Sequence, residues 1–510
     1  MTFYDILFPA EAGVVALSSE APACFADLNL DQVMDAITDG RQEYDLRPFF
    51  CTPLRDSETI RYRQAIARDL EDKALLACIK SFADQMRMAR RYLALAKKLR
   101  FRHHREGWFL EAARVYCEAV TSLRHDLAPA ALASDGLSAF REYLAAYVDS
   151  DQFTVLLGDT VKLKGDLAAI KYCMIIKDGT VKVRRYEGET DYSVEVSDTF
   201  AKFRQGAVKD YGTNFTTGSG MSHVGARILD CVARLHPDEF AALNHYCDAH
   251  SAFADETIRV FDRQVQFYVA YLEYIAGLKK AGLAFCYPQI SCQRKQVHAD
   301  DSFDLALAHQ RVAEGTAVVS NSFFLTGPER VIVVSGPNQG GKTTFARMFG
   351  QLHYLASLGC PVPGSRARLY LFDRLLTHFE KEEDIRNLRG KLQDDLVRIS
   401  AILERATPDS IIILNEIFAS TTLEDAVFLS SRIMERIMQL DLLCVCVTFI
   451  DELASLSAKT VSMVSTVVPE NPAERTFKIV RKPADGLAYA ISIVEKHRLT
   501  FEQIKERIRA

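Results

Sequence analysis

The spacing of apolar residues changes along the chain and predicts its elements. From about Pro53 to Val148 apolar residues recur at helical spacing, with little Pro or Gly, so a helical region is expected. The same pattern returns from about His223 to Leu283. From about Pro288 onward, short apolar runs alternate with helical segments, which is typical of an α/β fold with a largely parallel sheet.

A β-hairpin is predicted between the two helical regions. In YCMIIKDGTVKVRRYEG two β-rich runs flank Asp178-Gly179, and both turn residues tolerate a positive φ. With this turn, four apolar side chains share one face of the hairpin: Met174, Ile176, Val181 and Val183. The opposite face carries the basic residues Lys177, Lys182 and Arg184, with Arg185 next in line.

Chain length and net charge limit the number of domains and the possible binding partners. The 510 residues are too many for one ordinary core, so several domains are expected. The net charge of −5 does not indicate nucleic acid, and any such binding must come from local patches. One such patch is the basic stretch from Lys80 to Arg105, in which Arg87, Arg91, Lys98 and Arg102 are expected on one helix face. The patch is either a nucleic-acid contact or an ordinary solvated surface.

The cysteines and the amino terminus favour a cytoplasmic protein. The 12 cysteines include no CxxC pair, and Cys444 and Cys446 alternate in an apolar run that predicts a buried strand. Reduced thiols are therefore expected. The first residues carry acids and no basic segment, so no signal peptide is expected. No apolar run approaches the roughly 20 residues of a membrane span.

A phosphate-binding loop is predicted after the apolar run Val331–Val334. The segment GPNQGGKTT fits G-x-x-x-x-G-K-[ST], between a predicted strand and a predicted helix. Its glycines let backbone N–H groups converge on phosphate oxygens, and its lysine neutralises phosphate charge. The expected nucleotide-binding residues are Gly336, Pro337, Asn338, Gln339, Gly340, Gly341, Lys342, Thr343 and Thr344.

A second apolar run, IIIL, ends at Asn415-Glu416. Phosphate-loop enzymes place an acid at this strand end to hold the water shell of the metal, and the next acid can polarise the attacking water. Asn415 brings no charge, so a weaker Mg²⁺ site is expected, formed by Thr343 and Asn415. Glu416 is the candidate general base and, with Lys342, forms the candidate catalytic pair.

At these residues the chain resembles the MutS family of DNA mismatch-repair ATPases. GPNQGGKTT is similar to the family's GPNMGGKST, and NEIFAST to its DEIGRGT. VVSNSFFL is similar to the VPND stretch ahead of the loop, which implies that Asn321 contacts the nucleotide. The segment from Thr52 to Leu70 is similar to the opening of the family's helical core. Because this resemblance begins near residue 45, a short member without the mismatch-reading and connector domains is expected.

The resemblance implies an architecture of helical core and lever, β-rich clamp and ABC-type P-loop ATPase. The expected segments are 1–45 (amino-terminal), 46–160 (helical core and lever), 161–221 (clamp-like insert), 222–285 (returning lever) and 286–510 (ATPase). ATP and Mg²⁺ are the implied cofactors, and a homodimer on double-stranded DNA is the implied assembly. The hairpin residues Lys177, Lys182, Arg184 and Arg185 are then the candidate DNA contacts.

Two departures from the family leave two functions open. Asn415 replaces the metal-side Asp, and Phe449 replaces the family's γ-phosphate-sensing His, so slow hydrolysis is expected. The first hypothesis is a dimeric ATPase that clamps duplex, mismatched or branched DNA. The second is a nucleotide-gated scaffold that recruits protein partners and has no direct DNA role.

Overall fold

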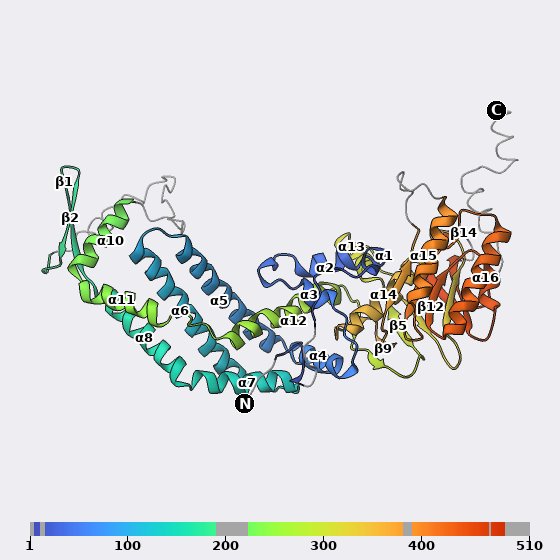
Figure 1. The fold of residues 1–510 in the computed structure, drawn as a ribbon, viewed down its shortest axis with the longest axis horizontal. Helices are drawn as coiled ribbons and strands as arrows, with labels where there is room; N and C mark the ends of the chain where they lie inside the picture. Colours follow the sequence, from blue (N-terminus) through green and yellow to red (C-terminus); the bar gives the residue numbers. More distant parts are fainter. Residues whose placement is uncertain (1–4, 11–15, 190–222, 381–389, 469–470, 485–510) are drawn as a thin grey trace, which may run out of the picture. The chain divides into compact units, whose positions relative to one another are not determined.

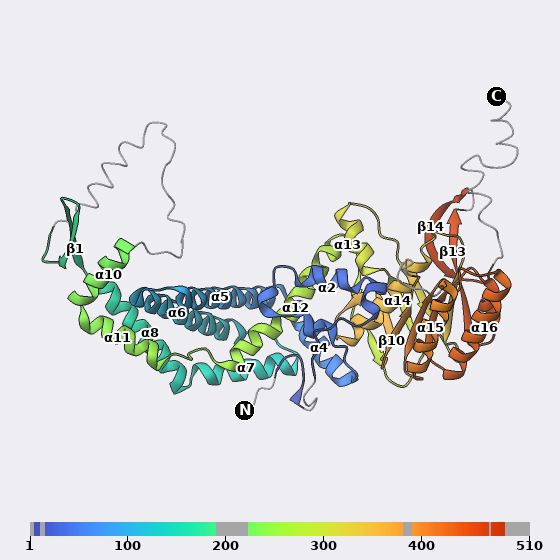
Figure 2. The same ribbon diagram turned by 45° about the horizontal axis from the view of Figure 1, so that its top comes forward.

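The chain folds into two compact units (Figure 1, Figure 2). The computed structural model describes all residues except 1–4, 11–15, 190–222, 381–389, 469–470 and 485–510. The unit called here the helical unit comprises Met1–Phe3, Asp72–Leu132 and Ser138–Asp262. The unit called the sheet unit comprises Tyr4–Glu71, Ala133–Leu137 and Arg263–Ala510.

The helical unit is organised around two long helices that lie side by side, α5 (Lys73–Lys98) and α6 (Arg102–Leu127) (Figure 1). On α5 the buried residues follow helical spacing, with Leu75, Ile79 and Phe82 at less than a tenth exposed. The other helices with residues in this unit are α7 (Asp135–Val148), α8 (Asp151–Ala169), α10 (His223–Leu235), α11 (Pro237–Ala249) and α12 (Glu256–Lys280).

The break between α5 and α6 corrects one expectation. The chain leaves the helix at Leu99 (ψ 137°) and starts a new one at Arg102, because the two helices pack against each other as a hairpin. Arg102 therefore does not share a helix face with Arg87, and its Nε instead donates to Oε1 of Glu106 at 2.7 Å.

The predicted hairpin is present as β1 (Tyr172–Lys177) and β2 (Thr180–Arg185). Its register is confirmed, because Ile176 pairs with Val181 and Met174 with Val183. Asp178 and Gly179 form the turn with φ of 53° and 73°. In the expected clamp-like insert, residues 161–169 belong to α8, and residues 190–222 lie outside the described residues.

The sheet unit begins with short elements that precede its main sheet in the chain. These are α1 (Cys24–Leu28), α2 (Leu30–Thr38), η2 (Gln42–Tyr44), α3 (Arg47–Cys51) and α4 (Ser57–Asp69). Arg63 of α4 is 1% exposed and donates to the backbone carbonyls of Leu7 and Leu358 at 2.9 and 3.2 Å. Burial lowers the pKa of this guanidinium. Arg63 thus fastens the amino-terminal segment to the end of α14 (Lys342–Ser357).

The main sheet has six strands in the order β10-β11-β12-β7-β13-β14. Strands β10 (Leu375–His378), β11 (Ile411–Asn415), β12 (Leu443–Val447), β7 (Val331–Ser335) and β13 (Thr460–Val468) are parallel, and β14 (Asn471–Arg481) is antiparallel to β13. This confirms the prediction of a mixed α/β architecture with a largely parallel sheet. Cys444 and Cys446 lie in β12 and are fully buried.

Helices cover both faces of this sheet. On one face, α15 (Lys391–Arg405) and α16 (Leu423–Leu440) form a core with Ile412 and Leu414. On the other face α14 packs so closely that a Cβ on Gly350 would lie 2.8 Å from Cδ1 of Ile413. The alternation of Ile412 and Ile413 between the faces is the period of two that a strand requires.

A smaller sheet lies beside the main one in the same unit. Its order is β4-β9-β5-β6, formed by β4 (Gln289–Ser291), β9 (Arg366–Tyr370), β5 (His298–Ser302) and β6 (Asn321–Phe324). The remaining elements are β3 (Phe285–Cys286), β8 (Val362–Pro363), α13 (Leu305–Ala313) and η3 (Asp451–Ser455). Among the helices that the structure describes, none combines the length and apolar character of a membrane span.

Candidate functional site

The loop between β7 and α14 has the backbone of a phosphate cradle. Gly336, Gln339 and Gly341 all adopt positive φ, at 112°, 60° and 90°. These values turn the chain sharply from the strand into the helix, and α14 begins directly at Lys342. The amino-terminal N–H groups of α14 are therefore presented at the loop, as anion binding requires.

One buried serine explains why Gly340 must be a glycine. Ser465 of β13 donates its hydroxyl to the carbonyl of Gly340 at 2.7 Å. A Cβ on Gly340 would lie 2.2 Å from that hydroxyl oxygen and 2.9 Å from the carbonyl oxygen of Pro337. The loop is thus pressed against the neighbouring strand.

Lys342 is held inside the loop. It is 5% exposed, and its ammonium donates to the carbonyls of Gly336 and Pro337 at 3.0 and 3.2 Å and to Oδ1 of Asn338 at 3.3 Å. Burial lowers the pKa of Lys342, while the Glu416 carboxylate, 3.9 Å away, acts in the opposite direction. The two candidate catalytic residues are therefore neighbours.

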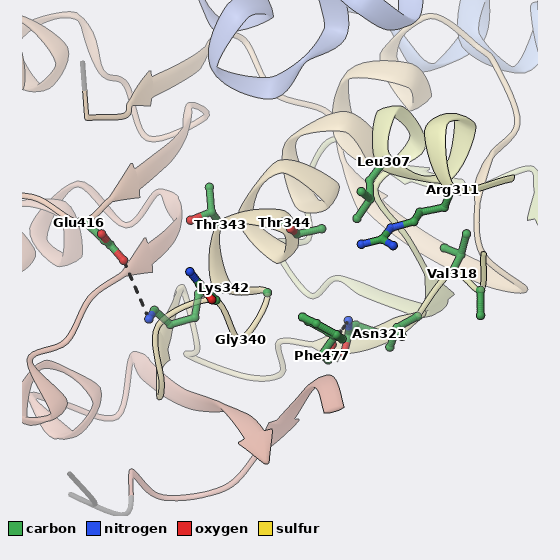
Figure 3. Close-up of a pocket in the computed structure, with 14 residues that line it drawn as sticks. Leu307, Arg311, Val318, Asn321, Gly340, Lys342, Thr343, Thr344, Glu416 and Phe477 are labelled. Carbon is green, nitrogen blue, oxygen red and sulfur yellow. Dashed lines mark hydrogen bonds and ion pairs between the residues drawn. The ribbon is translucent and has the colours of Figure 1, made fainter. Parts of the chain in front are cut away.

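The carboxyl end of β11 lies at the same edge of the sheet as the loop, and the two are in contact. The Thr343 hydroxyl donates to Oδ1 of Asn415 at 2.9 Å, so the two predicted metal ligands are in direct contact. Glu416 follows with a φ of 54° and donates its backbone N–H to the carbonyl of Val447 at 2.9 Å. This left-handed turn aims the carboxylate toward Lys342 (Figure 3).

A cavity of about 430 Å³ opens in front of the loop (Figure 3). The sequence-predicted residues that line it are Asn321, Gln339, Gly340, Gly341, Lys342, Thr343, Thr344 and Glu416. The other predicted residues do not line the cavity but contact residues that do: Gly336, Pro337 and Asn338 accept from Lys342, and Asn415 accepts from Thr343. Sequence reasoning missed six lining residues: Leu307, Arg311, Ala317, Val318, Val319 and Phe477.

Asn321 joins two strands at the cavity wall. Its amide nitrogen donates to the carbonyl of Phe477 at 3.1 Å, and its amide oxygen accepts from the N–H of Ile479 at 2.7 Å. The predicted nucleotide contact thus holds β14 against β6. Phe477 adopts a φ of 57° and is 46% exposed at the cavity.

The donor set fits a nucleoside triphosphate with Mg²⁺. A hydroxyl and an amide oxygen lie together at Thr343 and Asn415, and oxygen ligands of this kind suit magnesium. The glycine loop and the Lys342 ammonium offer N–H donors and positive charge for phosphate oxygens. Phe449, in the predicted sensor position, is 49% exposed and carries no polar group.

The basic residues of the hairpin are not equivalent. Arg184 forms ion pairs with Glu187 at 3.6 Å and Glu189 at 2.6 Å, and Arg185 donates to the carbonyl of Leu235 at 2.7 Å. Lys177 and Lys182 are exposed. The two lysines are therefore the more available positive charges.

Comparison with known proteins is consistent with the site. The family model described as "MutS domain V" matches residues 332–505. Over 215 residues the chain is 28% identical to the DNA mismatch repair protein MutS of Zymomonas mobilis, covering 41% of this chain and 25% of that protein. It is 25% identical over 206 residues to the protein of the same name from Thermotoga maritima, covering 39% of this chain and 26% of that protein. The chain thus spans about a quarter of the length of these curated relatives.

The parallel sheet, the glycine loop after β7 and the helix that follows define an α/β domain of the phosphate-loop class. Over residues 332–505 this domain is similar to MutS domain V.

Proposed function

We propose that this protein binds ATP with Mg²⁺, hydrolyses it slowly, and binds duplex, mismatched or branched DNA as a nucleotide-gated dimer related to mismatch repair. The observation that carries the proposal is the convergence of Lys342 and Thr343, at the start of α14, and Glu416, directly after β11, on one cavity. The similarity to DNA mismatch repair proteins of Zymomonas mobilis and Thermotoga maritima supports the DNA part.

Each residue of the site has a chemical role in this proposal. Lys342 neutralises charge that develops on the transferring phosphoryl group, and the glycine loop positions the phosphates. Thr343, with Asn415 behind it, would hold Mg²⁺, which when bound neutralises phosphate charge. Glu416 accepts a proton from the attacking water as general base, because its carboxylate lies beside Lys342 and faces the cavity.

Two features support a slow reaction. Asn415 adds an amide where a carboxylate would add negative charge, which weakens the attraction for a divalent cation. Phe449 has no hydrogen-bond donor to offer the outermost phosphate. Both changes lower transition-state stabilisation more than they lower nucleotide binding.

The exposed Lys177 and Lys182 support the DNA part of the proposal. Contacts from lysine to phosphate give affinity without reading sequence, so binding would be strongly salt-dependent. Dimerisation through the phosphate-loop domains would couple this binding to ATP.

A second candidate is a nucleotide-gated scaffold without a DNA role. The engagement of Arg184 by Glu187 and Glu189 favours it, because this pairing removes positive charge from the hairpin face.

A DNA titration with and without ATP separates the two functions. Fluorescence anisotropy would be measured with homoduplex, mismatched duplex and four-way junction, for the wild type and for Lys342→Ala. We expect DNA binding that ATP modulates in the wild type, and no ATP response in Lys342→Ala, because that variant loses its charge in the phosphate loop. No binding at low salt to any of the three DNA forms would leave the scaffold function.

A further inference from the structure

A second cavity, of about 440 Å³, lies in the sheet unit and is lined mainly by residues of α1, β10 and α15. Its volume falls in the range of roughly 300–1,000 Å³ that is usual for small-molecule sites. Its lining shares no residue with the cavity at the phosphate loop. Leu375 of β10 pairs with Ile411, the first residue of β11, whereas Glu416 follows the last residue of that strand. The amino end of β10 thus lies at the sheet edge opposite to the phosphate loop.

Three arginines line this second cavity. Arg374 directly precedes β10, and Arg398 and Arg405 belong to α15. Because seven residues make about two helical turns, Arg398 and Arg405 lie on the same face of their helix. The packing of α15 on β10 brings the three side chains to one cavity, although no basic motif in the sequence joins them.

The three guanidinium groups have spare hydrogen-bonding capacity. Each has five N–H donors. Arg374 donates to the carbonyl of Arg405 at 2.5 Å, and Arg398 donates to the carbonyl of Phe379 at 3.0 Å. The guanidinium of Arg405 makes no hydrogen bond or ion pair with any residue that the structure describes. Most of these donors therefore have no acceptor among the described residues.

The two acids of the lining accept hydrogen bonds from hydroxyl groups and do not neutralise the arginines. Asp27 accepts from the Thr377 hydroxyl at 2.6 Å. Asp373 accepts from the hydroxyls of Thr407 and Ser410, both at 2.8 Å. Neither carboxylate forms an ion pair with an arginine in the part of the chain that the structure describes. With three arginines and two aspartates the lining has a formal charge of +1, which favours an anion.

The rest of the lining is largely apolar. Phe372 and Leu376 are less than a tenth exposed, so they belong to the packed core and form a fixed surface. A ligand that combines an anionic group with an apolar or aromatic body matches both parts of this lining. The apolar side chains that such a body could contact are Pro22, Pro53, Phe372, Leu376 and Ile402.

We propose that this second cavity binds a small phosphate monoester, with the phosphate on Arg374, Arg398 and Arg405 and the organic group on the apolar surface. A phosphate monoester carries a charge of about −1.5 to −2 at neutral pH and three acceptor oxygens, and guanidinium groups bind such oxygens in pairs. A carboxylate has one charge and two oxygens, so it would leave more of the donors unused. The inference is independent of the proposed function, because the two cavities have no residue in common.

Calorimetric titration of the full-length protein with phenyl phosphate, inorganic phosphate and phenol tests the proposal. We expect phenyl phosphate to bind most tightly, because it fills both parts of the lining. Inorganic phosphate should bind more weakly, since it lacks the ring, and phenol should not bind detectably, since it lacks the charge. Lys342→Ala should still bind phenyl phosphate, because that change affects only the phosphate loop.

Substitution of the arginines assigns the binding to this cavity. Arg405→Gln should weaken phenyl phosphate by about tenfold, the effect of losing one hydrogen bond to a charged group. Arg405 is exposed and has no partner among the described residues, so the variant should fold normally, which a thermal melt checks. Arg398→Gln is the second variant, with the same expected loss. Arg436→Gln is the matched control, because it removes an exposed arginine from α16 and should leave the affinity unchanged.

Three results would overturn the inference. Loss of phenyl phosphate binding in Lys342→Ala would place the anion at the phosphate loop alone. Equal affinity for phenol and phenyl phosphate would mean that the charge is not recognised. Unchanged affinity in both Arg405→Gln and Arg398→Gln would exclude this cavity. Failure of ATP to bind the wild type would contradict the proposed function and leave this inference standing, so the two failures are distinguishable.

Discussion

The loop after β7 is held by strands far from it in the sequence, whereas the β1–β2 hairpin is held mainly by its own register. Ser465 of β13 bonds to Gly340, and Asn415 of β11 bonds to Thr343. In the hairpin, Arg184 pairs with Glu187 and Glu189, a few residues along the chain. A short sequence motif predicted each region, but only the loop is held in place by other strands of the sheet.

This difference matters for function. Side chains that are fixed from several elements keep the spacing that catalysis needs, because their rotamers are locked by packing. Exposed lysines on a hairpin keep their rotational freedom and suit a diffuse electrostatic contact. The structure therefore favours chemistry at the loop and non-specific binding at the hairpin.

The largest effect is expected at the loop, from Glu416→Gln. Loss of the general base should lower the rate of ATP hydrolysis by about 10²- to 10⁴-fold. Nucleotide binding should persist, because Lys342 keeps its contacts to the loop carbonyls. Phosphate release and a nucleotide titration on the same preparation measure the two effects. A rate that is unaltered would remove Glu416 from the catalytic pair.

A smaller effect is expected where the loop presses on β13. Gly340→Ala places a Cβ 2.2 Å from the Ser465 hydroxyl and should lower the free energy of unfolding by about 1–3 kcal/mol. Chemical denaturation would report it. Gly277→Ala is the matched control, because Gly277 lies inside α12 with open space around it, and alanine should stabilise that helix slightly. Equal stability of the two variants would contradict the tight contact.

The double change Ser465→Gly with Gly340→Ala sharpens this test. It removes the closest contact but leaves the carbonyl oxygen of Pro337 at 2.9 Å, so we expect only part of the stability to return.

The smallest effect is expected at the hairpin. Lys177→Ala with Lys182→Ala should make the slope of log affinity for duplex DNA against log salt shallower by about 1.8, or 0.9 for each lost phosphate contact. Lys279→Ala with Lys280→Ala removes the same charge from the end of α12 and should leave the slope unchanged. Equal slopes for wild type and hairpin variant would exclude the lysines as contacts.

Local pattern predicted the elements well where one segment decides its own conformation. The register of the hairpin followed from Asp178-Gly179, and the strand–loop–helix unit followed from the glycines around Lys342. The pattern failed at Leu99, where continuous helical spacing hides a turn. There the packing of α5 on α6, which is a tertiary effect, decides the break.

Local pattern also failed to predict part of the cavity lining. Arg311 and Phe477 belong to no motif, and they meet the loop only because α13 and β14 pack beside it. An isolated arginine near the end of a short helix gives no signal by itself. A possible signal is the apolar pair Val318-Val319, two residues before Asn321, since it indicates an apolar wall next to a residue predicted to contact the nucleotide.

The two hydrogen bonds of Asn321 couple β6 to β14, which are far apart in the sequence. Whatever displaces Phe477 must also pull on Asn321, and through β6 on the smaller sheet. A ligand bound at one end of the cavity would then shift the smaller sheet, which contacts no phosphate. The side-chain amide of Asn321 is the connection between the two.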